Sequence, residues 1–308
     1  MMRVLFVVNP KSGKANIKNT LLGITDILTK AGMLVTVYVT QEAKDATETV
    51  KKIGGDFDVI ACSGGDGTLD EVVAGVMMLD RNIPIGYIPA GSTNDFARSL
   101  GISADNLEAA RAITRGQQFQ CDLGLFNQSY FTYIAAFGAF TEVSYSTPQQ
   151  TKNMLGHLAY ILEGAKSLAS IHSHNIQVEY MDAEEEKMVV IEDDIILGMV
   201  TNSISVGGMK RYKEEDVSFD DGLFEVVLIR RPKNMLELNA ILGSLLLNDF
   251  NKDYMYYFKT AQLKVESDEE IKWTLDGEFG GSVKMAEIQN IKQGFSIYRN
   301  MEIQAESN

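Results

Sequence analysis

The chain has 308 residues, of which 45% are hydrophobic and 23% charged, and its formal net charge is −14 at pH 7. This size and composition are typical of a globular protein with two domains. The acidic balance argues against nucleic acid as a partner and against simple electrostatic adsorption to an anionic membrane. Two cysteines without a disulfide framework favour the reducing cytoplasm. No signal peptide or membrane-spanning segment is predicted.

In the first 122 residues, short apolar runs alternate with segments of helical length. Strands are predicted over residues 3–8, 33–39, 57–62 and 84–88, and helices over residues 17–31, 43–53, 69–79 and 106–115. Such βα repetition predicts an α/β domain over residues 1–122, with a doubly wound, mostly parallel sheet. The loops that follow the strands are then expected at one edge of that sheet.

Three of these loops have the composition of a phosphate-binding site. They comprise Asn9-Pro10-Lys11-Ser12-Gly13, Gly64-Gly65-Asp66-Gly67-Thr68 and Gly91-Ser92-Thr93-Asn94-Asp95. Glycines let backbone N–H groups approach an anion, and a helix N-terminus adds partial positive charge. For the second and third loops, a plain turn that caps a helix is an equally good interpretation. Neither G-x-x-x-x-G-K-[ST] nor G-x-G-x-x-G occurs, which disfavours the ordinary P-loop and dinucleotide-binding motifs.

Asp66 and Asp95 lie within two of these loops, although a carboxylate repels phosphate. A divalent cation or a bridging water would have to lie between each carboxylate and the ligand. The two side chains therefore indicate magnesium together with a nucleotide.

After residue 122 the pattern changes, because strand-type segments cluster. Strands are predicted over residues 121–126, 130–137, 175–181, 187–192, 195–201, 223–229, 261–266 and 271–275. We expect a mainly antiparallel β domain over residues 123–289, and residues from about 290 to 308 are candidates to pack back on the first domain. Apolar residues at helical spacing predict amphipathic helices over residues 155–169 and 235–250.

Two basic blocks stand out in this acidic chain. They are Met209-Lys210-Arg211-Tyr212-Lys213 and Arg230-Arg231-Pro232-Lys233. Each could contact lipid headgroups, and each could equally be solvated loop charge. The sequence leaves both interpretations open.

The order and spacing of five blocks resemble the diacylglycerol kinase catalytic-domain family, which includes bacterial soluble lipid kinases. The blocks are Asn-Pro-Lys-Ser-Gly at 9–13, Gly-Gly-Asp-Gly-Thr at 64–68, Pro-Ala-Gly-Ser-Thr-Asn-Asp-Phe-Ala-Arg at 89–98, Asp-Asp-Gly-Leu-Phe-Glu-Val at 220–226 and Leu-Asp-Gly-Glu at 275–278. NAD kinases and phosphofructokinases also carry Gly-Gly-Asp-Gly, so only the five blocks together are specific. Ser92 stands where the family more often has Thr, which preserves the hydroxyl.

The resemblance implies an ATP-dependent lipid kinase that transfers the γ-phosphoryl group to a lipid hydroxyl, with diacylglycerol as the first candidate acceptor and phosphatidic acid as the product. It implies a nucleotide site formed by Asn9, Pro10, Lys11, Ser12, Gly13, Thr40, Gly64, Gly65, Asp66, Gly67, Thr68, Glu71, Ser92 and Asn94. Magnesium would be held mainly through its waters by Asp66, Asp95 and Glu278.

Asp276 resembles the catalytic base of the family, and Asp276-Gly277 is also typical of a type I′ hairpin turn. On an extended segment, Asp276 and Glu278 would face the same side. The resemblance further implies a second, structural magnesium ion bound by Asp221 and the Leu223 carbonyl, with Ser218 where relatives can have another aspartate.

The implied partner is a lipid at the membrane surface, met by a cytoplasmic protein that is peripheral to the inner face, and a homodimer is compatible with the sequence. Two other functions stay open: phosphorylation of a soluble nucleotide, as in NAD kinases, and nucleotide binding by a non-catalytic regulator. The block at 89–98 does not look like the second motif of NAD kinases. A regulator would have no use for Asp-Gly-Glu at 276–278 beyond a turn.

Overall fold

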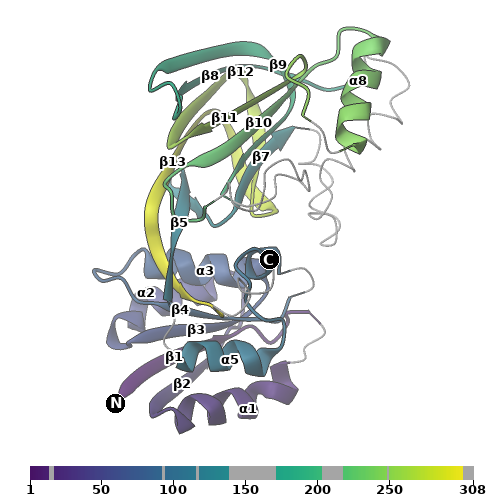
Figure 1. Ribbon diagram of the computed structural model, residues 1–308. Helices are drawn as coiled ribbons and strands as arrows, with labels where there is room; N and C mark the ends of the chain where they lie inside the picture. Colours follow the sequence, from purple (N-terminus) through teal and green to yellow (C-terminus); the bar gives the residue numbers. More distant parts are fainter. Residues whose placement is uncertain are drawn as a thin grey trace. The chain divides into compact units, whose positions relative to one another are not determined.

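The computed structural model describes residues 1–13, 17–91, 94–115, 118–138, 171–202, 218–247 and 250–300 (Figure 1). These residues form a mixed α/β structure in which strands predominate, so the predicted mixture of α/β and β-rich parts is confirmed at that level. The chain divides into two compact units. One is formed by Met1–Cys121 and the chain from Gln293 onwards, and the other by Asp122–Lys292. The helix predicted over 155–169, the basic block at 209–213 and Ser92 lie outside the described residues.

The sheet of the first unit consists of the parallel strands β1 (Met2–Val8), β2 (Met33–Val39), β3 (Val59–Gly64) and β4 (Ile85–Pro89). Their order is β4-β3-β1-β2, and every residue of β3 and β4 is buried. Strands that are covered on both faces have continuous apolar sequences instead of alternating ones. The continuous apolar sequences of β3 and β4 make these two strands easy to predict.

The helices of the first unit are α1 (Ile17–Lys30), α2 (Asp45–Ile53), α3 (Asp66–Val76), α4 (Asp95–Ser99) and α5 (Asn106–Thr114), with a short 3₁₀ turn at Gly54–Asp56. α1 packs against α5 and α2 against α3, and the two pairs lie on opposite faces of the strands (Figure 1). The helix predicted over 69–79 begins at Asp66 instead, which makes Gly65 its N-cap.

The second unit is built mainly from antiparallel strands. Its elements are β6 (Ser129–Phe131), β7 (Ile134–Gly138), β8 (His174–Met181), β9 (Met188–Thr201), β10 (Phe224–Arg230), α8 (Met235–Leu246), β11 (Met255–Thr260), β12 (Gln262–Leu275), most of β13 (Glu278–Tyr298) and the end of β5 (Gln118–Phe126), which begins in the first unit. Neighbouring strands follow the order β11-β10-β9-β7-β12-β13, and β8 pairs with both β9 and β12. β13 begins in this unit and ends in the first one, where Ile297 pairs in parallel with Ile85 of β4.

Several predicted boundaries in the second unit are wrong. The strand predicted over 130–137 is two strands, β6 and β7, because backbone N–H groups at residues 132–134 donate to the Asp276 carboxylate. The strands predicted over 187–192 and 195–201 are a single strand, β9, and those over 261–266 and 271–275 are a single strand, β12. The helix predicted to residue 250 ends at Leu246.

Acidic residues in the middle of β9 explain one of these errors. Asp193 accepts from Arg230 Nε at 2.6 Å and from the Tyr256 hydroxyl at 2.7 Å, so the carboxylate is neutralised within the sheet. A charged stretch that looks like a turn can therefore stay in a strand. β11 is missing from the prediction, which gives no bounds for the strand expected after the hairpin turn, β13. Glycines and polar residues interrupt the apolar pattern of β13.

Two apolar clusters fill the second unit. In one, Trp273 packs against Phe126 and Phe137 at ring-centroid distances of 5.0 and 4.7 Å. The other joins Leu238 and Ile241 of α8 to the strands beneath them. Such packing normally excludes charge unless it is paired.

Glu225 in β10 is a carboxylate at only 1% exposure, and it forms a cross-strand ion pair with Lys259 at 3.2 Å. Burial raises the pKa of Glu225 from 4.5 to about 7, although Lys259 acts in the opposite direction. At pH values between 4.5 and about 7, Glu225 is protonated in the folded state and ionised in the unfolded state. Stability therefore falls as the pH rises through this window, and the loss is complete above about pH 7.

We expect Glu225→Gln to remove this pH dependence. Relative to the variant, the unmodified protein should lose up to about 3 kcal/mol of unfolding free energy between about pH 5 and 8. Urea unfolding in the presence of EDTA measures the effect. Glu266→Gln is the control, because it removes a half-exposed ion pair with Lys264 at 2.7 Å and should keep the original slope. The same slope in Glu225→Gln would contradict the assignment.

Candidate active site

Three glycine-containing loops lie together at the carboxyl edge of the parallel strands. They follow β1, β3 and β4, whose carboxyl ends share one edge. The Asn9 N–H donates to the Ser63 carbonyl at 2.9 Å, and the Ala90 N–H donates to the Gly64 carbonyl at 2.7 Å. Backbone hydrogen bonds thus hold the second loop between the other two. The structure brings together the loops that the sequence places at one edge.

Glycine is required where these loops touch. A Cβ added to Gly91 would lie 2.6 Å from the Cα of Gly65, and one added to Gly13, whose φ is +54°, would lie 2.2 Å from the Ala90 carbonyl oxygen. No side chain fits at either position. Gly65 differs, because a Cβ added to it would lie 3.5 Å from its nearest neighbour, the Cα of Gly91, which is an ordinary van der Waals distance. Packing therefore does not demand a glycine at residue 65.

The N-terminus of α3 lies at this edge. Its N-cap is Gly65, which has no side chain, whereas Asp105 and Asn234 cap α5 and α8 with their side chains. The first N–H groups of a helix have no partner within the helix, and they carry partial positive charge. An anion such as a phosphate group is a suitable partner for this helix end.

Two asparagines among the predicted nucleotide ligands hold the loops themselves. Asn9 accepts from the Lys11 N–H at 3.0 Å and donates to the Thr68 hydroxyl at 3.0 Å. Asn94 has a left-handed backbone at φ 50°, accepts from the Gly91 N–H at 2.9 Å and donates to the Gly91 carbonyl at 3.0 Å. These bonds fix the shape of the first and third loops.

Two other predicted ligands are engaged within the first unit. Thr40 is buried, and its N–H and hydroxyl both donate to the Val8 carbonyl, at 2.9 and 3.4 Å. Glu71 accepts from the N–H groups of Lys44 and Ala46, at 2.8 and 3.2 Å. Its carboxylate thus fastens the start of α2. The other described candidates lie in the first loop and the first turn of α3, namely Pro10, Lys11, Ser12 and Gly67.

The carboxylates of Asp66 and Asp95 belong to the same edge. Asp66 Oδ2 accepts from the Asp95 N–H at 3.1 Å. Asp95 is half-buried, and burial raises its pKa, an effect that Arg98 opposes. A nearby cation favours the charged form of a partly buried carboxylate, so these surroundings suit a divalent metal ion.

Tyr87 of β4 connects the second and third loops, and the sequence analysis missed it. The residue is 1% exposed, and its hydroxyl lies 3.3 Å from the Gly64 carbonyl and 3.4 Å from Asn94 Oδ1. Burial and the Asp66 carboxylate both raise the pKa of Tyr87. The one available signal was a lone hydroxyl in an otherwise apolar strand.

Asp276 lies in a two-residue turn between β12 and β13, in the second unit. Asp276 and Gly277 have φ values of 50° and 87°, and Leu275 pairs with Glu278, which defines a type I′ turn. The predicted hairpin turn is confirmed. The expectation that Asp276 and Glu278 share one face of an extended segment is wrong, because the turn separates them and leaves Glu278 exposed at the start of β13.

The backbone between β6 and β7 surrounds the Asp276 carboxylate. Oδ2 accepts from the Thr132 N–H at 2.5 Å and from the Thr132 hydroxyl at 3.2 Å. Oδ1 accepts from the N–H groups of Tyr133 and Ile134, at 3.0 and 2.9 Å. Burial raises the pKa of Asp276 although these hydrogen bonds lower it. A carboxylate with a raised pKa is the stronger proton acceptor.

The predicted structural metal site lies in the loop before β10. Asp221 Oδ1 accepts from the Leu223 N–H at 2.9 Å, and the Ser218 hydroxyl donates to the Asp220 carboxylate. Across the described part of the chain, no group of three or more His, Cys, Asp or Glu side chains is arranged to hold a metal ion. A cation in this loop would therefore need carbonyl, hydroxyl or water ligands as well.

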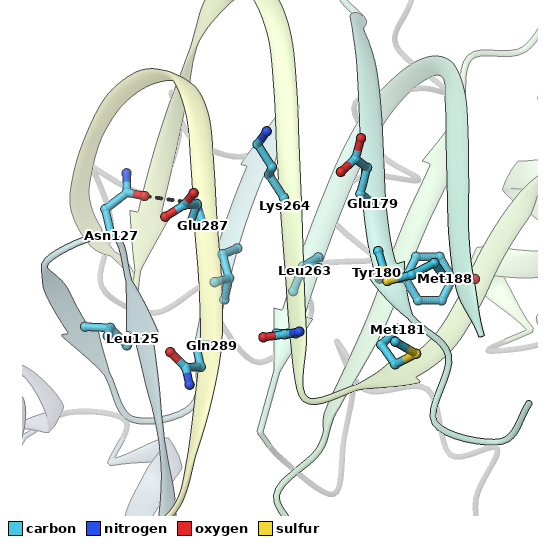
Figure 2. A pocket seen from close by; sticks show the side chains of 12 residues that line it. Leu125, Asn127, Glu179, Tyr180, Met181, Met188, Leu263, Lys264, Glu287 and Gln289 are labelled. Carbon is cyan, nitrogen blue, oxygen red and sulfur yellow. Dashed lines mark hydrogen bonds between the residues drawn. The ribbon is translucent and has the colours of Figure 1, made fainter. Parts of the chain in front are cut away.

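A pocket of about 370 Å³ lies over β5, β13, β12, β8 and β9 (Figure 2). Within it, Lys264 lies in register between Glu179 and Glu287, and Asn127 accepts from the Glu287 N–H at 2.9 Å. Two carboxylates beside one cation disfavour a phosphate ligand. The described residues that line this pocket include no predicted nucleotide, metal or catalytic residue.

Glycine-lined loops at the carboxyl edge of a parallel sheet, with a helix N-terminus and two carboxylates, define a nucleotide-binding protein of the phosphoryl-transfer class. The family model for the diacylglycerol kinase catalytic domain matches residues 3–126. Diacylglycerol kinase of Bacillus subtilis (strain 168) is 36% identical over 284 residues, 91% of each chain. Diacylglycerol kinase of Staphylococcus carnosus (strain TM300) is 33% identical over 298 residues, 96% of this chain and 94% of that one.

A crystal structure of a diacylglycerol kinase from Bacillus anthracis str. Sterne has a TM-score of 0.73 over 97% of both chains, at 24% identity, which supports the fold. The chain belongs to the diacylglycerol kinase family. It is a lipid kinase, a phosphotransferase with an alcohol group as acceptor. These matches favour that function over NAD kinase-like activity and over a non-catalytic regulator.

Proposed function

We propose that this lipid kinase transfers the γ-phosphoryl group of ATP to the free hydroxyl of diacylglycerol, which gives phosphatidic acid and ADP. The observation that carries the proposal is the glycine-lined edge of the first unit, where a side chain or a ligand would have space at residue 65, the N-cap of α3. The names of the relatives, which match over more than 90% of the chain, supply the acceptor. The first unit would be the nucleotide domain, near the expected 1–122, and the second the lipid domain, near 123–289.

ATP would bind through backbone N–H groups at the start of α3, within Gly64–Thr68. Close approach of a triphosphate requires glycines, and the contacts at Gly13 and Gly91 leave no room for side chains. We assign the first loop, residues 9–13, and Asn94 to the same site, where their hydrogen bonds shape the edge. Thr40, Glu71 and Ser92 complete the proposed set.

Asp66 and Asp95 would hold the magnesium ion that accompanies ATP. Mg²⁺ keeps several waters and usually takes one or two carboxylates beside substrate phosphates, which suits the pair joined by the bond from the Asp95 N–H to Asp66. When bound, the ion neutralises negative charge on the phosphoryl group. Glu278 is proposed as a further, water-mediated contact. Asp221, the Leu223 carbonyl and Ser218 are proposed ligands of a separate structural ion.

We expect Tyr87→Phe to raise the magnesium concentration for half-maximal activity by about tenfold or more, the effect of losing one hydrogen bond to a charged group. The ring still fills the core, whereas Asp66 and Asn94 lose the hydroxyl that touches them. Magnesium titrations at saturating ATP measure the shift. Tyr38→Phe is the control, because its hydroxyl donates to Asp45 at 2.9 Å, outside the loops. Lower thermal stability with unchanged magnesium dependence would make Tyr87 purely structural.

Asp276 is proposed to accept the proton of the substrate hydroxyl. Its four hydrogen bonds fix the carboxylate, and the longest comes from the Thr132 hydroxyl at 3.2 Å. A hydroxyl can rotate away, which would free one lone pair of Oδ2 for the substrate. As the lipid oxygen bonds to the γ-phosphorus, the bond to ADP breaks and the hydroxyl proton passes to Asp276.

The lipid acceptor requires contact with a membrane, and the described residues include no helix that is long and apolar enough to cross one. We propose that the protein acts as a peripheral protein at the cytoplasmic face, where ATP is available. Cys62 and Cys121 are buried and form no disulfide, which suits a reducing compartment.

The test is to incubate the protein with labelled ATP and Mg²⁺ and offer detergent-dispersed diacylglycerol, NAD or no acceptor. We expect labelled phosphatidic acid in the lipid extract of the sample with diacylglycerol. ADP should form in that sample and not in the samples with NAD or without an acceptor. Labelled NADP in the second sample would establish the NAD kinase-like alternative. ATP binding without ADP from any acceptor would indicate a regulator.

A further inference from the structure

We infer that the outer face of α8, with the basic turn before it, is a membrane-docking surface for an anionic lipid bilayer. This surface, which we call the α8 surface, comprises Lys233, Leu236, Ala240, Gly243 and Leu247. The inference rests on the proposed function, since diacylglycerol resides in a bilayer. It assigns one of the two basic blocks that the sequence analysis leaves open.

The inner face of α8 already satisfies the packing of the helix. Leu238, Ile241 and Leu245 are 3%, 0% and 1% exposed within the apolar cluster of the second unit. At its start, the Asn234 side chain accepts from the N–H groups of Leu236 and Glu237, both at 3.0 Å. A surface helix held in this way normally presents polar residues on its outer face.

The outer face of α8 carries an apolar stripe instead, beside the exposed Asn239. Leu236 is 81% exposed, and Leu247, directly after the helix, is 80% exposed. Residues 236, 240, 243 and 247 follow one another at helical spacing and are Leu, Ala, Gly and Leu. A Cβ added to Gly243 would meet nothing within 4 Å among the described residues, so none of them covers the middle of this stripe.

The one charged side chain within Met235–Leu246 is Glu237, and its carboxylate is occupied. Oε2 accepts from the Lys233 N–H at 2.7 Å, and Oε1 accepts from Asn234 Nδ2 at 3.0 Å. The carboxylate therefore serves the helix start. It does not make the outer stripe polar.

Charge complementarity indicates lipid as the partner. Residues 230–236 contain three basic residues and no acidic one, in a chain whose net charge is −14. Arg230 is bound to Asp193 at 2.6 Å, whereas Lys233 is exposed next to the apolar stripe. Exposed apolar side chains beside Lys and Arg are the pattern of a helix that lies in a membrane interface. Because the whole chain would be repelled by anionic lipid, attraction must be local in this way.

The experiment uses vesicles of phosphatidylcholine and phosphatidylglycerol that contain diacylglycerol, and it measures co-sedimentation without ATP. We expect the double variant Leu236→Gln/Leu247→Gln to bind these vesicles at least about tenfold more weakly, since two leucine side chains no longer enter the interface. Lys233→Gln should weaken binding to these vesicles and leave weak binding to pure phosphatidylcholine unchanged. Turnover of a short-chain diacylglycerol dissolved as monomers should stay unchanged in both variants.

Leu22→Gln is the matched control, because Leu22 of α1 is 82% exposed and lies in the other unit. It should bind vesicles like the unmodified protein. Equal vesicle binding by the double variant, or an equal loss in Leu22→Gln, would overturn the inference. So would a dimer that the double variant dissociates while vesicle binding persists, because the α8 surface would then meet a second copy. Vesicle binding by a protein that phosphorylates no diacylglycerol would contradict the proposed function and leave the α8 surface standing.

Discussion

Gly65→Val should abolish ATP binding while the protein stays folded. Residue 65 has an extended backbone at φ −86° and ψ −174°, which valine adopts readily. A Cβ there would lie 3.5 Å from the Cα of Gly91, so folding does not require glycine. The valine methyl groups would instead fill the space over the first N–H groups of α3, where the phosphates are proposed to bind.

Titration calorimetry with ATP and Mg²⁺ measures this loss, which we expect to exceed about 100-fold in affinity. The control is Gly55→Val in the 3₁₀ turn, where an added Cβ would meet no described atom within 4 Å. Gly91→Ala should behave differently and destabilise the fold, since its Cβ would lie 2.6 Å from a backbone atom of Gly65. Normal ATP affinity in folded Gly65→Val would show that nucleotide does not use this helix end.

Asp276→Asn should lower turnover by about 100-fold or more, the scale of losing a general base. Asparagine tolerates the left-handed turn, where φ is 50°. The amide offers one acceptor oxygen and one donor NH₂ to the four donors around Asp276, so part of the bonding to residues 132–134 is lost. Thermal stability should therefore fall as well, while the KM values for ATP and lipid change little.

Thr132→Val distinguishes a role of Asp276 as the catalytic base from a purely structural role in the turn. The variant removes the hydroxyl bond at 3.2 Å and keeps the backbone bonds. With one fewer hydrogen bond to the anion, the pKa of Asp276 rises further, and the acidic limb of kcat/KM against pH should move to higher pH. A limb that does not move, or normal turnover in Asp276→Asn, would leave Asp276 with a structural role only. Magnesium titration of Glu278→Gln provides the comparison for a metal contact.

Local sequence was sufficient where a feature depends on neighbouring residues. β1, β3 and β4 are buried apolar runs, each of the loops after them contains glycine, and Asp276-Gly277 has the residue types that a type I′ turn demands. These features fix the α/β character of the first unit and the arrangement of its edge. They could be predicted because each is decided within a few residues.

Features that depend on distant contacts could not be predicted. The break between β6 and β7 exists because Thr132 donates to Asp276, 144 positions away. Tyr87 matters because its hydroxyl contacts Gly64 at the end of β3 and Asn94 in the loop after its own strand, β4. Neither pairing leaves a periodic signal in the sequence, and β13 acquires its strand conformation from β12 and β4 rather than from its own composition.

The path of β13 has a consequence for how the chain is made. The first unit is not contiguous, because its residues after Gln293 follow the whole second unit. Phe295 and Ile297 are fully buried there, Phe295 lies 6.1 Å from the Phe96 ring, and Gln118 donates to the Tyr298 hydroxyl at 3.2 Å. These residues leave the ribosome after the whole second unit, so the rest of the first unit must wait with the β4 edge unpaired. The first unit should thus complete its fold only after the whole second unit has emerged.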